Sequence, residues 1–177
     1  MPVHVALLRG INLGNHHKVP MKDLRAALEA HGFVNVRTYI QSGNVVFEAP
    51  RGRHGAAISK VVEARFGHID VPVMMRRGAE LTRVEAVHPF ALRGEDITKV
   101  HVTFLDSKPT AAALERLADF DTRGDELEVI GKEVYLFCPN GYGRTKLTNK
   151  LFERRLGVAA TTRNFKTVRA LAGMVAG

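Results

Sequence analysis

The predicted strands and helices of this chain follow one order twice, and that repeat is the strongest constraint on its fold. In the first part, apolar stretches of strand length and apolar residues at helical spacing come in the order strand, helix, strand, strand, helix, strand. The predicted strands are residues 3–9, 34–41, 44–49 and 71–76, and the predicted helices run from Pro20 to Gly32 and from Ile58 to Phe66. This order is typical of the ferredoxin-like, split βαβ fold.

The same order returns in the second part, after a short predicted helix at residues 79–87. The strands predicted there are residues 100–105, 126–130, 133–137 and 158–162, and the helices begin at Pro109 and Lys146. A terminal helix follows from Asn164. The sequence therefore predicts an α+β protein of two ferredoxin-like βαββαβ halves, with antiparallel or mixed sheets and a terminal helix. We expect the halves at residues 1–88 and 97–177, joined by a connector at 89–96.

Two short turns that contain glycine predict how the strands pair. Ser42-Gly43 and Gly131-Lys132 each separate two predicted strands as a two-residue hairpin loop would. At Ser42-Gly43, such a loop gives the opposite pairs Ile40–Val45, Thr38–Phe47 and Val36–Ala49 on one apolar face, and Arg37–Glu48 on the other. At Gly131-Lys132 it gives the pairs Leu127–Leu136 and Val129–Val134.

Nearly all of the net positive charge lies in the last part of the chain. The 177 residues include 26 Lys and Arg against 18 Asp and Glu, a formal charge of +8. Residues 139–177 hold eight of these basic residues and a single acid, Glu153. Such asymmetry predicts an anionic partner: nucleic acid, a nucleotide, an acidic protein or an anionic metabolite. The alternative is a basic helix face that is merely solvated.

Several classes of protein are disfavoured by what the sequence lacks. The single cysteine, Cys138, excludes an internal disulfide and a cysteine metal cluster, and the adjacent His16 and His17 have no spaced partner set, so we expect no metal. No cofactor motif, nucleophile motif or pair of carboxylates stands out, so no cofactor is implied, and Cys138 is expected to be a buried structural thiol. No apolar run approaches the ~18 residues of a membrane span. The N-terminus does not read as a signal peptide. We therefore expect a cytoplasmic protein.

Three polar segments are candidates for ligand contacts. Residues 9–14 join a predicted strand to a predicted helix, and their glycines and the start of the helix favour the binding of an anion. The segment also fits a structural turn. Residues 41–44 form a hairpin tip whose side chains either bind a ligand or satisfy the turn backbone. The third segment, residues 143–150 with 161–164, is basic. Within it, Thr145 is expected to cap the following helix, and Thr162 or Asn164 the last helix.

Three motifs resemble the bacterial family called domain of unknown function 1697. They are Ala-Leu-Leu-Arg-Gly-Ile-Asn-Leu-Gly at 6–14, Thr-Tyr-Ile-Gln-Ser-Gly-Asn-Val-Val-Phe at 38–47, and a tail with Lys-Leu-Thr-Asn at 146–149, Leu-Gly at 156–157 and Ala-Thr-Thr-Arg-Asn at 160–164. The resemblance extends from Val3 to about Leu171. It departs at Phe165, where the family often has Trp, and at residues 15–17, where it tends to have Gly and Lys. It implies a cytoplasmic α+β protein and supplies no catalytic mechanism.

The signature positions of that family give candidate ligand-binding residues. They map to Arg9, Asn12, Tyr39, Gln41, Ser42, Asn44, Lys146, Asn149, Arg163 and Asn164, and the basic segment adds Arg144. We hypothesise that these residues converge between the two halves, in a polar cleft for a phosphate-bearing or otherwise anionic ligand.

Three functions fit these residues. The first is a binding module for a nucleotide or nucleic acid. The second is a small enzyme acting on a phosphorylated or carboxylated metabolite, in which Arg9, Lys146 and Arg163 hold the anion. In that enzyme Asn12, Gln41 or Asn44 orients the reacting group, and Lys146 serves as a base only if its pKa is lowered. The third function is structural, with the polar residues holding the hairpin tip and the two halves together.

Overall fold

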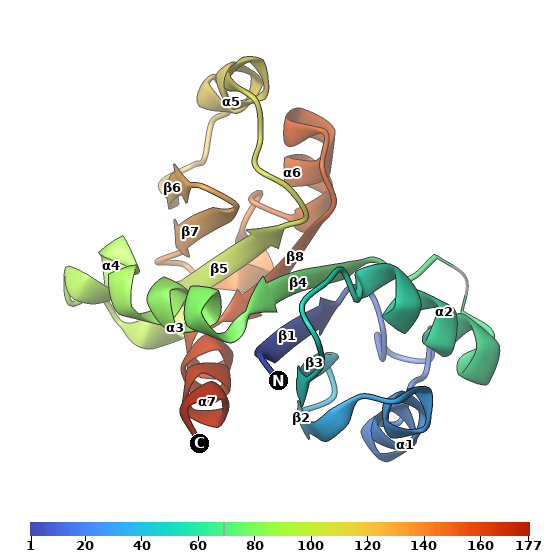
Figure 1. The fold of residues 1–177 in the computed structure, drawn as a ribbon. Coiled ribbons are helices and arrows are strands. Elements are labelled where there is room, and N and C mark those ends of the chain that lie inside the picture. Colours follow the sequence, from blue (N-terminus) through green and yellow to red (C-terminus); the bar gives the residue numbers. More distant parts are fainter. Residues whose placement is uncertain (69) are drawn as a thin grey trace. The chain divides into compact units, whose positions relative to one another are not determined.

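The fold is shown in Figure 1 as a computed structural model, which describes residues 1–68 and 70–177. By their internal contacts these residues divide into two compact units. One unit comprises Met1–Thr82 with Ala170–Gly177, and the other comprises Arg83–Arg169. Each unit contains one four-stranded sheet. The halves expected at residues 1–88 and 97–177 stay a prediction.

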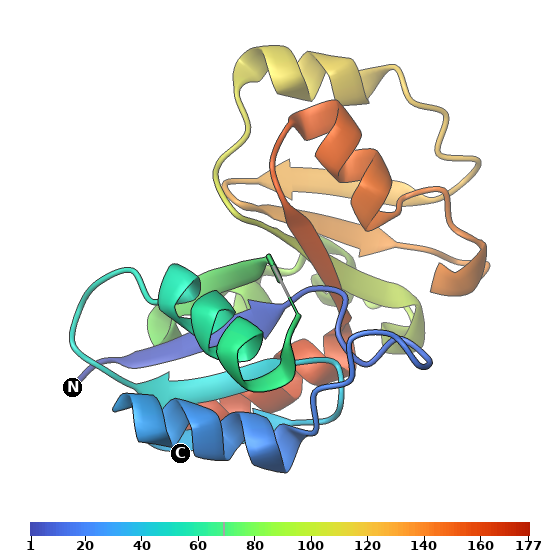
Figure 2. The same ribbon diagram turned by 90° about the vertical axis from the view of Figure 1, so that its right-hand side faces the viewer.

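The first unit has the strand order of a ferredoxin-like fold. Its elements are β1 (Val3–Leu8), α1 (Met21–His31), β2 (Val34–Tyr39), β3 (Asn44–Glu48), α2 (Gly55–Phe66) and β4 (Val73–Arg77), followed by the start of α3 (Gly78–Val87). The sheet is antiparallel, in the order β2-β3-β1-β4. Figure 2 shows α1 and α2 side by side over one face of it.

The helix α1 illustrates why these elements form. Its apolar residues recur at helical spacing, and Met21, Leu24 and Leu28 are all buried. The helix ends at Gly32, which takes the left-handed conformation with φ 116°, as the sequence predicted. Together with α2, this stripe packs against the strand residues that point to the same face, which makes one core of apolar side chains: Ala6, Leu8, Val45, Phe47, Ile58 and Val62.

The second unit repeats this architecture. Its elements are α4 (Pro89–Leu92), η1 (Ile97–Lys99), β5 (Val100–Leu105), α5 (Ala111–Ala118), β6 (Glu126–Ile130), β7 (Glu133–Phe137), η2 (Tyr142–Arg144), α6 (Asn149–Leu156), β8 (Ala160–Asn164) and the start of α7 (Phe165–Ala176). The antiparallel sheet has the order β6-β7-β5-β8, and its core includes Leu105, Leu117, Leu136 and Phe152. Two ferredoxin-like halves and a terminal helix are therefore confirmed.

The hairpin between β6 and β7 has the predicted register. Leu127 pairs with Leu136 and Val129 with Val134. Gly131 has φ 61°, which a two-residue hairpin turn requires at its first central position. Glycine reaches this conformation without the strain that a Cβ would bring.

The hairpin between β2 and β3 differs from the prediction by two residues. The observed pairs are Tyr39–Asn44, Thr38–Val45 and Arg37–Val46, so the turn has four residues, 40–43, instead of two. The shift is even from Arg37 to Tyr39, so Thr38 still shares a face with Val45, but Ile40, predicted on that apolar face, lies in the turn and is 52% exposed. The register changes again between Val34 and Arg37. The predicted pairing of Arg37 with Glu48 is wrong: Arg37 Nη1 donates to Met174 O at 2.9 Å, and Glu48 accepts a hydrogen bond from Asn35.

Helix α6 starts three residues later than predicted. Thr148, and not Thr145, caps it, by accepting from the N–H of Leu151 at 3.2 Å. Of the two predicted caps of α7, Asn164 is the one observed, because its Oδ1 accepts from the N–H of Thr167 at 2.8 Å. Among the described residues, every helix is too short or too polar to cross a membrane.

Candidate anion-binding site

The polar residues predicted in the first unit gather where the loop after β1 meets the turn between β2 and β3. Asn12 lies in that loop, and its Nδ2 donates to the carbonyl oxygen of Gln41 at 2.7 Å. Asn44 Nδ2 donates to Tyr39 O at 2.9 Å and to Ser42 Oγ at 2.8 Å. The structure therefore brings these five residues together around the turn.

The side-chain amides of Asn12 and Asn44 form hydrogen bonds within the protein. Asn12 Nδ2 also donates to Val19 O at 2.8 Å, and its Oδ1 accepts from the N–H of Val19 at 2.7 Å. Asn44 is completely buried. Arg9, the sixth predicted residue here, follows β1 directly, and its backbone N–H donates to Pro72 O at 2.9 Å. Because buried polar groups of this kind complete the hydrogen bonding of the fold, the structural interpretation suits this part of the signature best.

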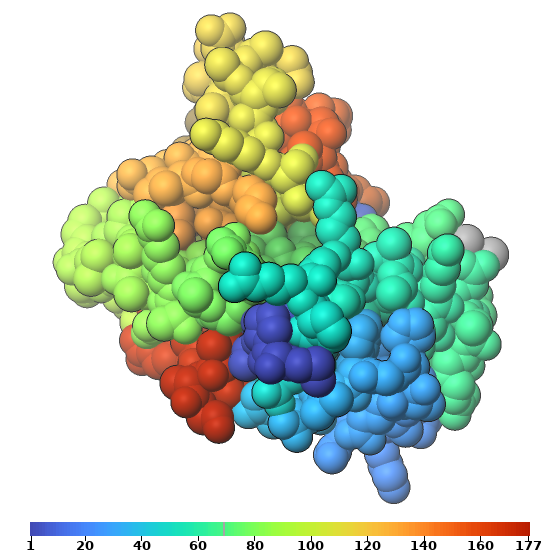
Figure 3. Space-filling view, in the orientation of Figure 1, coloured from blue at the N-terminus to red at the C-terminus, as the bar shows by residue number. Residues whose placement is uncertain are grey.

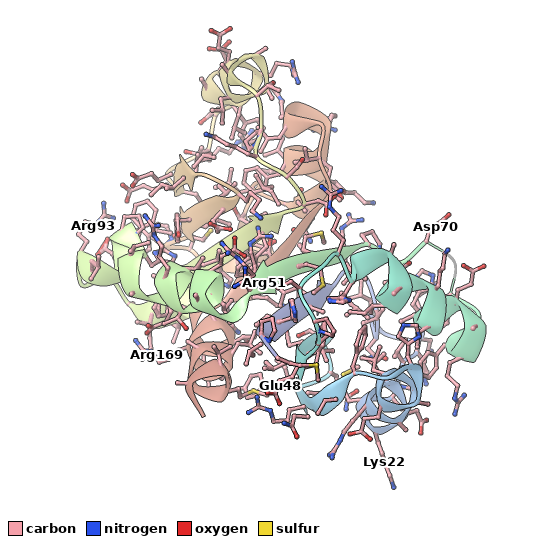
Figure 4. The ribbon with its side chains drawn as sticks, viewed as in Figure 1. Lys22, Glu48, Arg51, Asp70, Arg93 and Arg169 are labelled. Atoms are coloured by element: carbon pink, nitrogen blue, oxygen red, sulfur yellow. The ribbon has the colours of Figure 1, made fainter. Side chains whose placement is uncertain are left out.

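A cavity of about 460 Å³ opens beside this turn, at the start of α1. Asn12, Gln41, Lys18 and Lys22 are among its lining residues. Pro20 precedes the helix and provides no side-chain cap. In Figure 4 the Lys22 side chain extends away from α1.

A second basic cavity lies in the second unit, where two loops meet. One loop joins α5 to β6 and the other joins β7 to α6. The predicted residues Arg144 and Lys146 line this cavity, and Arg123 from the other loop lines it as well. Its volume is about 240 Å³, and its remaining lining residues are Thr122, Asp125, Asn140 and Gly141. Three cationic side chains thus converge on one cavity.

Hydrogen bonds fix the two loops to each other. Thr145 Oγ1 donates to Asp125 Oδ2 at 2.6 Å, and the same hydroxyl accepts from the N–H of Leu147 at 3.0 Å. Asp125 is therefore held by the neighbouring loop, although it contributes the one carboxylate among the lining residues. Three cations against one carboxylate give the lining residues a net positive charge, which favours an anion.

Two buried histidines are connected to the loop between β7 and α6. Tyr142 stacks on the ring of His101, with centroids 4.7 Å apart, and His101 is 7 % exposed. His88 Nδ1 accepts from the N–H of Phe90 at 3.3 Å, so its Nε2 carries the proton that it donates to His101 O at 2.9 Å. Burial lowers the pKa of both histidines below the ordinary value of 6.5. Both are therefore neutral at pH 7.

Acidification should weaken the fold through these two histidines. In the unfolded chain they bind protons near pH 6.5, whereas the folded state resists their protonation. Below pH 6.5 the unfolded state therefore binds more protons than the folded state. The contribution of the two neutral histidines to the free energy of unfolding is fully present above pH 6.5 and is lost as the pH falls below it. Each unit by which a pKa is lowered corresponds to about 1.4 kcal/mol.

Urea unfolding at neutral pH and at about pH 5.5 measures this loss. The variant His101→Phe keeps a ring against Tyr142 but cannot titrate, so it should lose less stability on acidification than the native chain. The control His31→Gln removes an exposed histidine from α1 and should leave the loss unchanged. If all three proteins lose the same stability on acidification, the loss does not come from His101.

The surroundings of Cys138 disfavour the reactive thiolate form. The residue is completely buried, and burial raises its pKa to about 11. The thiolate is the reactive form of cysteine, so a thiol with this pKa stays protonated and inert at neutral pH. This agrees with the structural role expected from the sequence.

The other predicted residues of the second unit do not line the cavity. Asn149 Oδ1 accepts from Thr162 Oγ1 at 2.7 Å, and Asn164 caps α7. Arg163 is 7 % exposed, and its Nη1 donates to Thr161 Oγ1 at 2.7 Å. Burial lowers the pKa of Arg163 to about 10, which still leaves it charged at neutral pH. That the predicted residues of the two units converge on one cleft stays a prediction.

Arg123 is not among the residues predicted from the sequence, because it lies outside both the basic segment after residue 139 and the family motifs. The signal was present in the run Asp121-Thr122-Arg123-Gly124-Asp125, a polar segment with the composition of a tight turn. Arg123 itself adopts φ 53° in that turn. Within the described residues, no group of three or more His, Cys, Asp or Glu side chains is arranged to hold a metal ion.

Comparisons with known proteins bear on the family and the fold. The model of a family described as "Protein of unknown function (DUF1697)" matches residues 1–135. The chain is also similar to the solved structure of the conserved bacterial protein SP0830 from Streptococcus pneumoniae. The TM-score is 0.73 at 22% identity, over 100% of this chain and 99% of that one, which shows a shared fold. No curated protein matches the chain.

Proposed function

This chain belongs to the DUF1697 family of proteins of unknown function, and we propose that it binds a small phosphate-bearing molecule in the cavity of its second unit. The observation that supports the proposal is the convergence of Arg123, Arg144 and Lys146 on one cavity. The carboxylate among the lining residues, Asp125, already accepts a hydrogen bond from Thr145. Guanidinium and ammonium groups form charge-assisted hydrogen bonds with phosphate oxygens, which are about twice as strong as neutral ones.

The size of the cavity favours a small ligand. Its volume of about 240 Å³ is below the range of pockets that enclose drug-sized molecules, and it suits a phosphate group with a small part of its carrier. Nucleic acid is the second candidate, because Lys150 and Arg154 of α6 are exposed and extend the basic surface. A polynucleotide would be bound through many such phosphate contacts along a surface.

Binding is better supported than catalysis. The Cys138 thiol is held in its protonated form, which disfavours nucleophilic attack. The Asp125 carboxylate is engaged by the Thr145 hydroxyl, which disfavours its use as a general base toward a ligand in the cavity. Neither of these two groups therefore supports the enzyme interpretation.

Isothermal titration with inorganic phosphate and with AMP tests the proposal. The variants Arg144→Gln and Lys146→Gln should each bind AMP about tenfold more weakly, a loss of ~1.4 kcal/mol, because each variant lacks one charge-assisted hydrogen bond. The matched controls are Lys150→Gln and Arg154→Gln, which remove one charge each from exposed positions on α6. The controls should bind AMP as the native chain does.

Two results would overturn this assignment. One is that neither phosphate nor AMP binds the native chain. The other is that short RNA or DNA binds, that its affinity falls steeply with salt, and that all four substitutions weaken its binding equally. Such behaviour is expected of a basic surface without a specific pocket.

A further inference from the structure

The first unit contains a larger cavity, to which we assign a second ligand: a small organic carboxylate with an apolar body. The cavity has a volume of about 540 Å³, which lies within the range of pockets that bury small organic molecules. It belongs to a different unit from the proposed phosphate site and shares none of its residues. The inference therefore does not depend on the proposed function.

Four segments of the first unit build this cavity. They are the start of β1 at residues 2–4, the loop after β3 at 51–52, the end of β4 with the start of α3 at 75–80, and Val175 near the end of α7. Figure 3 shows these segments meeting at the surface, where the dark blue N-terminus lies beside the teal loop, the light green start of α3 and the red end of α7.

Apolar side chains form much of the wall. Val3, Met75 and Val175 line the cavity from three different elements. The approach of Val3 and Val175 depends on Gly78, because a Cβ at that position would lie 2.8 Å from Val175 Cγ1 and 3.4 Å from Val3 Cβ. The glycine thus lets the chain bring these apolar side chains together, and a ligand with an apolar body would remove their surface from water.

Arginines supply the charge around this apolar wall. Arg51, Arg76 and Arg77 line the cavity, against the single carboxylate of Glu80. That carboxylate is already paired, since it accepts from the backbone N–H of Arg77 at 2.7 Å and from its Nη2 at 3.4 Å. Arg76 is buried, and its Nη1 donates to Met75 O at 2.8 Å.

Arg51 is the arginine expected to contact the ligand. It is exposed on the loop after β3, at the cavity, where Figure 4 labels it. A guanidinium binds a carboxylate through two parallel hydrogen bonds, which fixes its orientation. The combination of an apolar wall and an arginine at the opening therefore suits a carboxylate on an apolar body better than a neutral apolar molecule or a compact inorganic anion.

Nuclear magnetic resonance titration with octanoate tests this site. Octanoate should shift the backbone amide signals of Gly52, Gly78 and Ala79, which line the cavity. Acetate carries the same carboxylate without the apolar body, and 1-octanol carries the body without the charge. Each should bind at least about tenfold more weakly than octanoate, because each lacks one of the two contacts.

Two substitutions locate the ligand. Arg51→Gln should weaken octanoate binding about tenfold, whereas Arg53→Gln, in the same exposed loop but outside the lining residues, should not. Ala79→Phe places a ring at the cavity from an exposed helical position and should abolish binding. Arg144→Gln, in the other unit, should leave octanoate binding unchanged.

The proposal is overturned if octanoate moves none of these signals, if 1-octanol binds as well as octanoate, or if Arg51→Gln and Arg53→Gln weaken binding equally. Loss of octanoate binding in Arg144→Gln would also overturn it, because the ligand would then occupy the phosphate cavity. Failure of AMP to bind overturns the proposed function and leaves this inference intact.

Discussion

Replacing Gly43 with alanine should lower the free energy of unfolding by about 3 kcal/mol, the sum of a strained backbone and an overfilled core. Gly43 closes the turn between β2 and β3 with φ 89°. A Cβ there would lie 2.8 Å from Ile11 Cδ1 and 2.9 Å from Leu8 Cβ. Leu8 Cβ is fixed to the backbone of a buried strand, so only the strand itself could yield.

Urea unfolding of Gly43→Ala and Gly124→Ala separates the two causes. Gly124 has nearly the same φ, 92°, but nothing lies within 4 Å of the Cβ that alanine would add. The control should therefore lose only the cost of the backbone conformation, about 1 kcal/mol. Equal losses in the two variants would show that Gly43 is needed for its backbone angle alone.

The two hairpins show what a sequence can predict about register. Gly131 takes the positive φ that a two-residue turn needs, and β6 and β7 pair as predicted. At Ser42-Gly43 the same reasoning predicts a register that differs from the observed one by two residues. There the carbonyl groups of Tyr39 and Gln41 accept from the side chains of Asn44 and Asn12, which stabilises a four-residue turn.

The candidate site was only partly predictable for a related reason. The density of basic residues after residue 139 identified Arg144 and Lys146, because charge is visible in composition. Arg123 lies some twenty residues earlier, and only the folded loops bring it to the same cavity. Asn149 and Asn164, by contrast, bond to other side chains and to a helix start, which motif similarity cannot distinguish from ligand binding.

Asn12→Gly should lower the free energy of unfolding by about 2 kcal/mol, since it removes three hydrogen bonds of the loop after β1. Glycine is the suitable replacement because Asn12 has φ 55°, a conformation that glycine adopts without strain. The measured loss therefore contains no strain of the folded backbone, and it combines the lost hydrogen bonds with the greater backbone entropy of glycine in the unfolded chain.

Gln41→Ala is the matched control for Asn12→Gly, because Asn12 contacts only the backbone carbonyl of Gln41, and the Gln41 side chain is exposed. It should change the free energy of unfolding by less than about 0.5 kcal/mol. Both variants should bind AMP as tightly as the native chain if this turn is structural and the phosphate cavity lies in the second unit. A variant Asn12→Gly that keeps its stability but loses AMP binding would contradict that division and would move the anion site to the start of α1.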